Sequence, residues 1–266
     1  MMNQVTNAVT KISRLGRGIT ISWPPPVLLI PGILIAGIVL LPLVYLLLRT
    51  LGAGPELWEL LFRSRIFQIL VRTVVLVVAV TGVSLAISLP LAWLTTRTDL
   101  PGRRVWSVLT VLPLVIPSYV AGFVIIAALG PRGMLQQFLG TLFGLERLPE
   151  IYGFPGAMLT ITLVTFPYLL LTLQAAMQRL DPSLEEASRS LGVSPWNTFR
   201  RVILPQLRPA IAIGGILVAL YTLKDFGAVS LLRYETFTWA IYLQYQTSFD
   251  RILAAALSMV LVVVAV

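Results

Sequence analysis

The chain has 266 residues, of which 57% are hydrophobic and 12% charged, and its mean hydropathy is +0.89. Soluble domains carry about 25% charged residues, so this composition excludes an ordinary soluble domain and indicates a membrane protein. The sequence contains no cysteine and no histidine, which excludes a disulfide framework and a thiolate or imidazole metal site, and its net charge is +9.

Apolar runs follow one another along the chain, and most approach the length of about 20 residues that a helix needs to cross a bilayer. A polar, basic tail, residues 1–26, precedes them. The predicted spans are 27–48, 73–96, 105–129, 155–177, 209–223 and 252–266. The runs are continuous, whereas β-barrel strands alternate, so we predict an all-α fold, a polytopic transmembrane helical bundle of about six spans. The last run has no closing charge, and we expect it to be a truncated span.

Positive charges predict how the bundle is oriented. Cytoplasmic loops of membrane proteins carry an excess of Lys and Arg, and most of the net positive charge lies in the tail 1–26 and in loops 97–104 and 179–208. We therefore expect the N-terminus and loop 179–208 in the cytoplasm. An anionic membrane surface accounts for the positive charge, so no nucleic-acid partner is expected.

Prolines followed by polar residues interrupt two of the spans. Proline leaves backbone carbonyls without a partner, which membrane proteins tolerate where helices pack together or line a cavity. We predict that such positions, together with an aspartate just beyond the fifth span, line a pathway: Pro113, Pro117, Ser118, Tyr119, Pro167, Tyr168 and Asp225. Ordinary helix packing stays open as the alternative, because glycine and proline are frequent in transmembrane helices.

The segment 179–208 is polar and lies between two apolar runs. Asp181 followed by Pro182 is typical of a helix start, with an N-cap and a proline at the first helical position. Ser183 with Glu186 offers an alternative capping box. Gly192 occupies a position where a helix ends in a left-handed residue.

A second start follows the glycine, at Ser194-Pro195, and predicts a helix over 196–204. Pro205 and Pro209 are expected to separate this helix from the fifth span. The segment is therefore predicted to hold two short helices joined by a tight glycine turn. On physical grounds alone an interfacial amphipathic hairpin that covers the bundle is an equal alternative.

The spacing of Glu186-Ala187-Ser188, Gly192, Val202 and Leu204-Pro205 resembles the signature EAA–x3–G–x9–I–x–LP of ABC importer permeases. Ser188 stands in place of the second alanine of the signature, and Val202 in place of its isoleucine. The resemblance implies a MetI-like permease architecture in which loop 179–208 docks on an ATPase subunit and transmits its closure. The residues implied for docking are Glu185, Glu186, Ala187, Ser188, Gly192, Pro195, Leu204 and Pro205.

The sequence contains no phosphate-binding motif with which this chain could hydrolyse ATP. A phosphate-binding loop needs Gly-Lys-Ser/Thr, and the only lysines are Lys11 and Lys224, neither of which follows glycine. We therefore expect a non-enzymatic subunit without a cofactor, with ATP bound by a partner ATPase dimer. A membrane-embedded enzyme or an ion-coupled transporter is the alternative from another class, although either usually needs ionisable residues inside its spans, and the predicted spans contain none.

Two further stretches, 130–153 and 221–251, are similar to the iron(III)-type permeases of the inner membrane, whose chains are two fused six-helix halves. The resemblance makes this chain the N-terminal half of such a permease, with a second half fused or separate. It implies iron(III) delivered by a periplasmic binding protein. Permeases for thiamine, polyamine, sulfate or molybdate share the signature and stay open. Apolar residues at helical spacing over 134–142 predict an external helix, which either rests in the headgroups or docks the binding protein.

Overall fold

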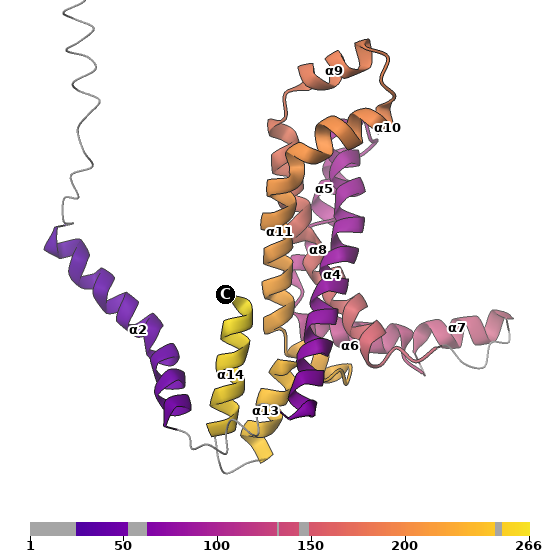
Figure 1. Ribbon diagram of the computed structural model, residues 1–266. Coiled ribbons are helices and arrows are strands. Elements are labelled where there is room, and N and C mark those ends of the chain that lie inside the picture. The colour runs from indigo at the N-terminus through magenta and orange to yellow at the C-terminus, as the bar shows by residue number, and fades with distance from the viewer. Residues whose placement is uncertain (1–24, 53–62, 132, 144–148, 248–251) are drawn as a thin grey trace, which may run out of the picture. The chain divides into compact units, whose positions relative to one another are not determined.

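The computed structural model describes residues 25–52, 63–131, 133–143, 149–247 and 252–266 (Figure 1). These residues contain helices and no strand, which confirms the all-α class. Residues 1–24 of the predicted tail lie outside the described residues. The α-helices are α2 (Pro26–Leu51), α4 (Ser64–Arg97), α5 (Arg103–Leu109), α6 (Ser118–Leu129), α7 (Met134–Phe143), α8 (Phe154–Arg179), α9 (Pro182–Ser190), α10 (Pro195–Thr198), α11 (Leu204–Lys224), α12 (Gly227–Leu231), α13 (Phe237–Thr247) and α14 (Ile252–Ala265).

Five segments in the described part of the chain are long and apolar enough to cross a bilayer. They are Pro26–Leu51, Ser64–Arg97, Ser118–Leu142, Phe154–Arg179 and Pro195–Lys224, and the shorter apolar helix Ile252–Ala265 follows them. Helix α2 has 26 residues with Pro31 and Pro42 inside it, and all of it up to Leu48 belongs to the first of two compact units. The rest of the chain, from Arg49 onward, forms the second unit.

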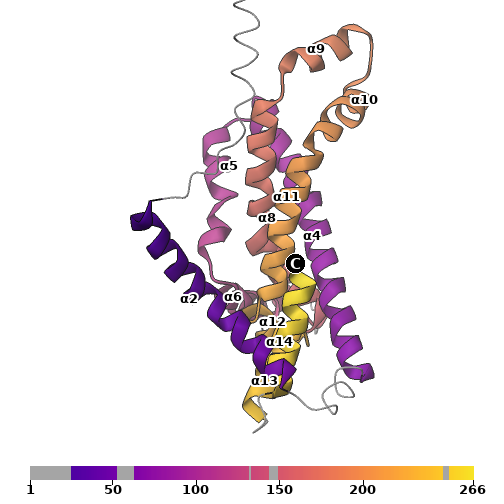
Figure 2. The ribbon, with the colours of Figure 1, turned by 60° about the vertical axis from the view of Figure 1, so that its left-hand side comes forward.

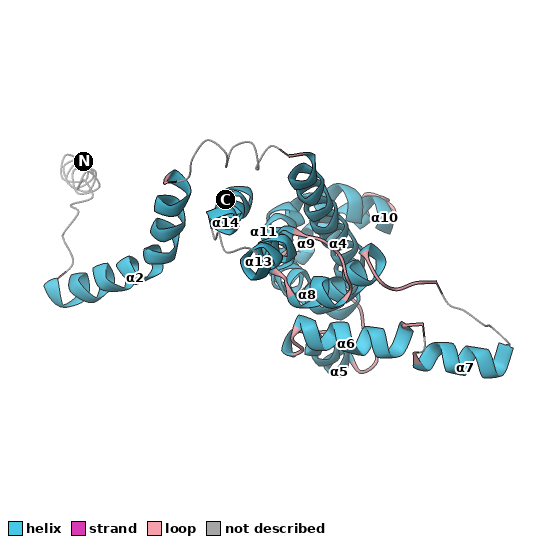
Figure 3. Ribbon diagram, turned by 90° about the horizontal axis from the view of Figure 1, so that it is seen from below, coloured by secondary structure: helices cyan, strands magenta, loops and turns pink. Residues whose placement is uncertain are grey.

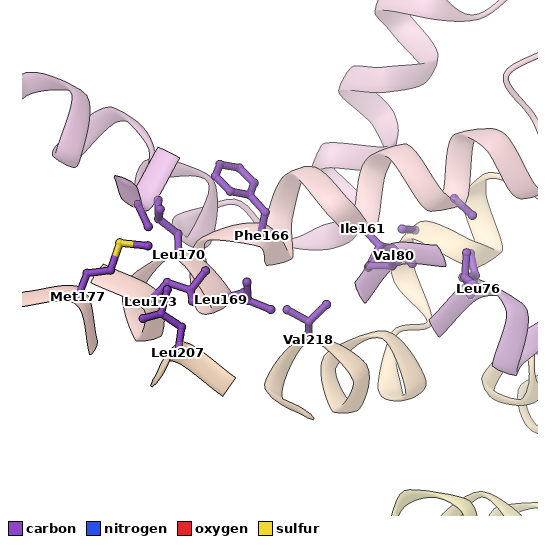
Figure 4. Packing of buried hydrophobic residues seen from close by; sticks show 14 of the residues in the cluster. Leu76, Val80, Ile161, Phe166, Leu169, Leu170, Leu173, Met177, Leu207 and Val218 are labelled. Carbon is purple, nitrogen blue, oxygen red and sulfur yellow. The ribbon is translucent and has the colours of Figure 1, made fainter. Parts of the chain in front are cut away.

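Helices α4, α8 and α11 lie side by side and form the core of the second unit (Figures 1 and 2). Helix α8 packs against both of the others, and half of its 26 residues are buried between them. Figure 4 shows Leu169 and Leu173 of α8 close to Val218 and Leu207 of α11. All four side chains are fully buried.

Small and hydroxyl-bearing residues let the three core helices approach closely. The Ser88 hydroxyl of α4 donates to the Phe166 carbonyl of α8 at 2.8 Å. On α11, a Cβ added at Gly214 would lie 2.4 Å from the Thr172 hydroxyl oxygen and 3.0 Å from the Leu169 Cα. Close approach through glycine and serine is the usual way in which membrane helices associate, because lipid provides no hydrophobic drive between them.

The third predicted span, 105–129, is not one helix, and this corrects the sequence-based expectation. The chain forms α5, then a 3₁₀ turn over Leu112–Val115, and restarts as α6 at Ser118. Pro113 lies in the 3₁₀ turn and Pro117 precedes α6, since a proline suits the first turn of a helix but not its interior. Helices α6 and α7 run across the direction of α4, α8 and α11 (Figures 1 and 3). The external helix predicted over 134–142 is confirmed as a helix, α7.

The polar segment after the fifth span folds back against the bundle. Short helix α12 packs on α6 and α8, and Ala228, Val229 and Leu232 are fully buried there. Helices α13 and α14 pack on each other, and Phe237 and Leu257 meet Ile69 of α4 in a second small core.

Candidate functional site

The loop between α8 and α11 projects beyond one end of the three-helix core (Figures 1 and 2). Its first helix, α9, begins as predicted at the Asp181 cap with Pro182 in its first turn, and the Ser183 backbone N–H donates to Asp181 Oδ1 at 2.9 Å. This hydrogen bond holds the pKa of the Asp181 carboxyl below its ordinary value. The cap is therefore Asp181 and not the alternative box that starts at Ser183.

Gly192 makes the turn between the two short helices. Its φ is +78°, the left-handed conformation in which glycine has no steric cost. Ser194 then caps α10 by accepting the Asn197 backbone N–H at 3.4 Å, with Pro195 in the first turn. The predicted pair of caps and the glycine reversal are confirmed.

The second helix of the loop does not end where the prolines predicted. After α10 the chain continues as a π-helical turn over Phe199–Ile203 and enters α11 at Leu204 without a break. Pro205 lies in the first turn of α11, where a missing N–H costs little. Pro209 lies inside the same helix. The separation predicted at Pro205 and Pro209 is wrong, because the π turn carries the chain from one helix into the next.

A buried hydroxyl pair joins the two arms of the loop. Ser188 Oγ of α9 and Thr198 Oγ1 of α10 are 2.9 Å apart, and both side chains are buried. The neighbouring Glu186 and Ala187 are exposed. Ser188 therefore holds the loop together from inside, whereas Glu186 and Ala187 are available to a partner.

Glu185 connects the loop to a helix that is distant in sequence. Its carboxylate lies 3.9 Å from Arg97 Nη1 at the end of α4, and Arg189 one turn along α9 also donates to it. The Arg97 guanidinium donates through Nη2 to the carbonyls of Met177 at 2.8 Å and Leu180 at 3.1 Å. Sequence reasoning missed Arg97, because nothing local relates residues so far apart.

Aromatic rings attach the second arm of the loop to the same helix. Phe199 meets Trp93 of α4 edge-on with 5.3 Å between ring centroids, and Trp196 stacks on Phe199 at 5.8 Å. These rings line an apolar groove together with Leu89, Pro90, Leu94 and Pro195. Leu191 is 82% exposed and Trp196 is 69% exposed, so the loop presents apolar surface outward.

At the opposite end of the core, part of the predicted pathway set comes together. The buried carboxylate of Asp225 accepts the Ala228 backbone N–H at 3.0 Å and also interacts with Ser118 at the start of α6. Tyr221 interacts with the same serine. The ring of Tyr168 lies 5.8 Å from the ring of Tyr221.

The remaining predicted pathway residues are placed differently. Pro113 and Pro117 form the break before α6, and the Tyr119 side chain is 54% exposed beside it. Pro167 is buried within α8, and its lining role stays a prediction. Tyr221 was not predicted, although its spacing of one turn before Asp225 is a signal that could have found it.

Known proteins resemble the chain in sequence. A family profile described as "Binding-protein-dependent transport system inner membrane component" matches residues 88–266. The Fe(3+)-transport system permease protein FbpB 2 of Haemophilus influenzae is 39% identical over 244 residues, which cover 91% of this chain and 44% of that protein. The sulfate transport system permease protein CysW of Escherichia coli is 31% identical over 215 residues, covering 80% and 72%. The molybdenum permease ModB of Escherichia coli is 31% identical over 161 residues, covering 59% and 69%.

Solved structures resemble the chain in fold. A bacterial ABC transporter for alginate import matches with a TM-score of 0.69 and 19% identity, covering 90% of both chains. The methionine ABC transporter MetNI matches with a TM-score of 0.55 and 20% identity, covering 77% of this chain and 93% of that one. The MetI-like architecture is thereby confirmed, and the chain spans less than half the length of the iron permease that it resembles. From residue 88 onward the profile includes the paired caps, the Gly192 turn and all of α8 and α11, and the chain belongs to the family of binding-protein-dependent transport system inner membrane components.

Proposed function

We propose that this chain is the membrane-spanning permease part of an ABC importer, and that a cytoplasmic ATPase dimer docks on loop 179–208. The observation that carries the proposal is the loop itself, in which two short helices meet at a left-handed Gly192 and project from the ends of α8 and α11. The N-terminus is then cytoplasmic, in agreement with the distribution of positive charge.

The chemistry of the loop surface supports docking. Leu191 and Trp196 are among its most exposed apolar side chains, and large exposed aromatic residues are typical centres of protein interfaces. Glu186 and Ala187 lie exposed on the first arm. A partner thus meets an apolar surface with one carboxylate available for an arginine. Hydrolysis of ATP belongs to that partner, since neither lysine of this chain stands in a phosphate-binding sequence.

We propose iron(III) as the substrate, delivered by a periplasmic binding protein. This chain would transport it in partnership with a second permease half, which is either fused to it or separate. Support comes from the iron permease of Haemophilus influenzae, which matches most of this chain. An oxyanion is the second candidate, because the sulfate permease CysW matches 80% of the chain at 31% identity.

The pathway residues that we propose are Ser118, Tyr119, Tyr168, Tyr221 and Asp225. Carboxylate, phenol and hydroxyl oxygens gather where α6 begins and α11 ends. Hard oxygen groups suit a hard cation as it passes. Asp225→Asn keeps an oxygen that can accept the Ala228 N–H but removes the charge, and we expect slower uptake with an unchanged amount of folded protein.

Docking is tested with Gly192→Pro and Glu186→Lys in proteoliposomes that contain the permease and its ATPase. Proline cannot adopt a positive φ, and lysine reverses the exposed charge, so both variants should insert normally but lose ATPase stimulation and uptake. Asp99→Lys, an exposed charge reversal in loop 97–104, is the matched control. Normal coupling in both loop variants would show that the loop is not the docking element.

The substrate is tested by supplying the reconstituted importer with binding protein loaded with ⁵⁵Fe(III), with ³⁵S-sulfate or with ⁹⁹Mo-molybdate in separate assays. We expect ATP-dependent accumulation of ⁵⁵Fe only. Accumulation of labelled sulfate or molybdate would reject iron and establish the oxyanion candidate, while leaving the docking role of the loop untouched.

A further inference from the structure

The two attachments of the α9–α10 loop to the bundle differ in stiffness. On the α11 side, helical structure is continuous from Pro195 through the π turn into α11. On the α8 side, Leu180 and Asp181 are both extended, with ψ angles of 132° and 118°. Each residue keeps one long turn hydrogen bond to its own helix, from the Leu180 N–H to the Met177 carbonyl at 3.3 Å and from the Leu184 N–H to the Asp181 carbonyl at 3.4 Å. In this fully described stretch, no backbone hydrogen bond passes from α8 to α9 across the two extended residues, so the connection between these helices is a joint about which α9 can pivot.

Arg97 is placed across this joint. Its guanidinium binds the Met177 and Leu180 carbonyls on the α8 side, at 2.8 and 3.1 Å. The same group faces Glu185 on the α9 side at 3.9 Å. A guanidinium is planar and presents its donors in a fixed fork, so one rigid group connects α4, α8 and α9.

The surroundings of Arg97 favour a mechanical contact over a solvated surface pair. The side chains of Arg97 and Glu185 are only 17% and 16% exposed, whereas Arg189, the other partner of Glu185, is 55% exposed. Exposed pairs of the Arg189 kind contribute little. Two further contacts hold the ends of α4 and α8 together, because Gln174 donates to Thr95 at 2.9 Å and Thr96 reaches the Met177 sulfur at 3.4 Å.

We propose that Arg97 is the residue that braces the joint between α8 and α9, so that displacement of α9 by the ATPase moves α4 and α8 instead of being absorbed by rotation at Leu180 and Asp181. Arg97 is a positioning residue that needs no contact with ATP or substrate. The inference rests on the proposed docking of the loop and adds that α4, which is remote from the loop in sequence, is driven directly.

The chain contains no cysteine, so a pair of cysteines can be introduced for spin labels without background. Ala86→Cys on α4 and Ser190→Cys on α9 are both exposed positions. In the reconstituted complex with its ATPase, we expect one narrow distance distribution that is the same without nucleotide and with ADP trapped by vanadate. Arg97→Gln should broaden the distribution and shift it when nucleotide is trapped, and should lower the uptake obtained per ATP hydrolysed.

Further variants separate the contacts of Arg97. Glu185→Gln removes the charge that faces Arg97 and also the exposed ion pair with Arg189, but it leaves the two carbonyl contacts of Arg97 in place, so it should broaden the distribution less. Arg97→Lys keeps the charge without the fork and should fall between wild type and Arg97→Gln. Arg103→Gln, an exposed arginine in loop 97–104, is the control and should behave as wild type. If Arg97→Gln does not fold, the distance distribution of Glu185→Gln is compared with that of wild type instead.

Two outcomes overturn the brace: an Arg97→Gln distribution as narrow as that of wild type in both states, or a wild-type distance that changes with nucleotide. Failure of the proposed function has a different signature, because the ATPase would then not bind the wild-type permease. Association of wild-type permease with its ATPase is therefore measured first, and the label experiment follows on the complex.

Discussion

At the loop end of the three-helix core, α9 and α10 stand outside the bundle and are held to it by a few side-chain contacts, whereas at the other end α12 is pressed into the bundle. Gly192 at the loop end has open space around it, and a Cβ there would meet no heavy atom within 4 Å. Gly227 at the other end lies so close to α6 that a Cβ would be 2.9 Å from the Ser118 hydroxyl oxygen. One end needs glycine for its backbone conformation and the other needs it for space.

The two ends therefore differ in how much of their surface is exposed and in how closely their backbones pack. The loop keeps apolar side chains such as Leu191 and Trp196 exposed, and the Ser188–Thr198 hydroxyl pair joins its two arms. The other end, where α12 meets α6, is made from backbone in close contact. A glycine-to-alanine substitution is therefore expected to destabilise the two ends for different reasons, by a steric clash at Gly227 and by backbone conformation at Gly192.

Gly227→Ala should have the largest effect. The added methyl would lie 2.9 Å from Tyr119 Cβ and 3.0 Å from the Tyr119 backbone nitrogen, so α12 has to move away from α6. Overpacking of this kind costs about 1–3 kcal/mol, and we expect a lower Tm of the purified protein. Gly215→Ala, whose nearest contact would be an ordinary 3.6 Å to Thr81, is the control and should keep the wild-type Tm. If Gly227→Ala and Gly215→Ala had the same Tm, the close contact between α12 and α6 would not be what requires glycine at position 227.

Gly192→Ala should be milder. A left-handed conformation costs a residue with a Cβ about 1–2 kcal/mol, but nothing obstructs the methyl group. We expect faster proteolysis of the loop in the purified protein without a change in the Tm of the bundle. Gly192→Asn should recover much of the loss, since asparagine tolerates the left-handed region. A bundle-wide loss of stability in Gly192→Ala would contradict the independence of the loop.

Ser188→Ala should loosen the two arms of the loop by about 1 kcal/mol, because it leaves the buried Thr198 hydroxyl without its partner. The double variant Ser188→Ala/Thr198→Val replaces both hydroxyls by apolar groups and should be less affected than the sum of the single variants. Hydrogen exchange of α9 and α10 measures the effect. Strict additivity of the two single changes would mean that the hydroxyls do not interact.

Asp181→Ala should have the smallest effect, confined to fraying of the first turn of α9. The pKa of the Asp181 carboxyl is lowered in the folded protein, so the charged cap contributes stability above the unfolded pKa and loses it as pH falls through the folded value. At neutral pH Asp181→Asn, which retains an accepting oxygen, should match wild type in hydrogen exchange of α9. Protection that rises on acidification below the ordinary pKa of aspartate would reverse the predicted sign.

Local features of the loop were predictable from sequence, because each depends on neighbouring residues. Asp181-Pro182, Ser194-Pro195 and Gly192 carry their own conformational preferences, and the structure places a cap, a cap and a turn there. The apolar spans were predictable for the same reason, since hydropathy is a local average. Thus the all-α class and the extent of α8 followed from the sequence.

Features that depend on direction or on distant partners were not predictable. Hydropathy cannot register a change of direction, so the run over 105–129 was predicted as one span although it turns at Pro113 and Pro117. The π turn that carries α10 into α11 leaves no sequence signal that a proline rule can detect. Likewise, Arg97 and Glu185 meet only because α4 and α8 end at the same level.

The interruption between α5 and α6 also restricts how this protein can be solvated. Ile116 and Pro117 have extended backbone, with ψ angles of 118° and 141°. The break meets part of its hydrogen-bonding need by itself, because the Ile116 N–H donates to the Pro113 carbonyl at 3.1 Å and the Pro117 carbonyl accepts the Ala121 N–H at 3.0 Å. Proline also has no N–H to satisfy. Hydrocarbon offers no hydrogen-bonding group, so acyl chains can cover this flank only where each backbone group of the break is bonded within the protein.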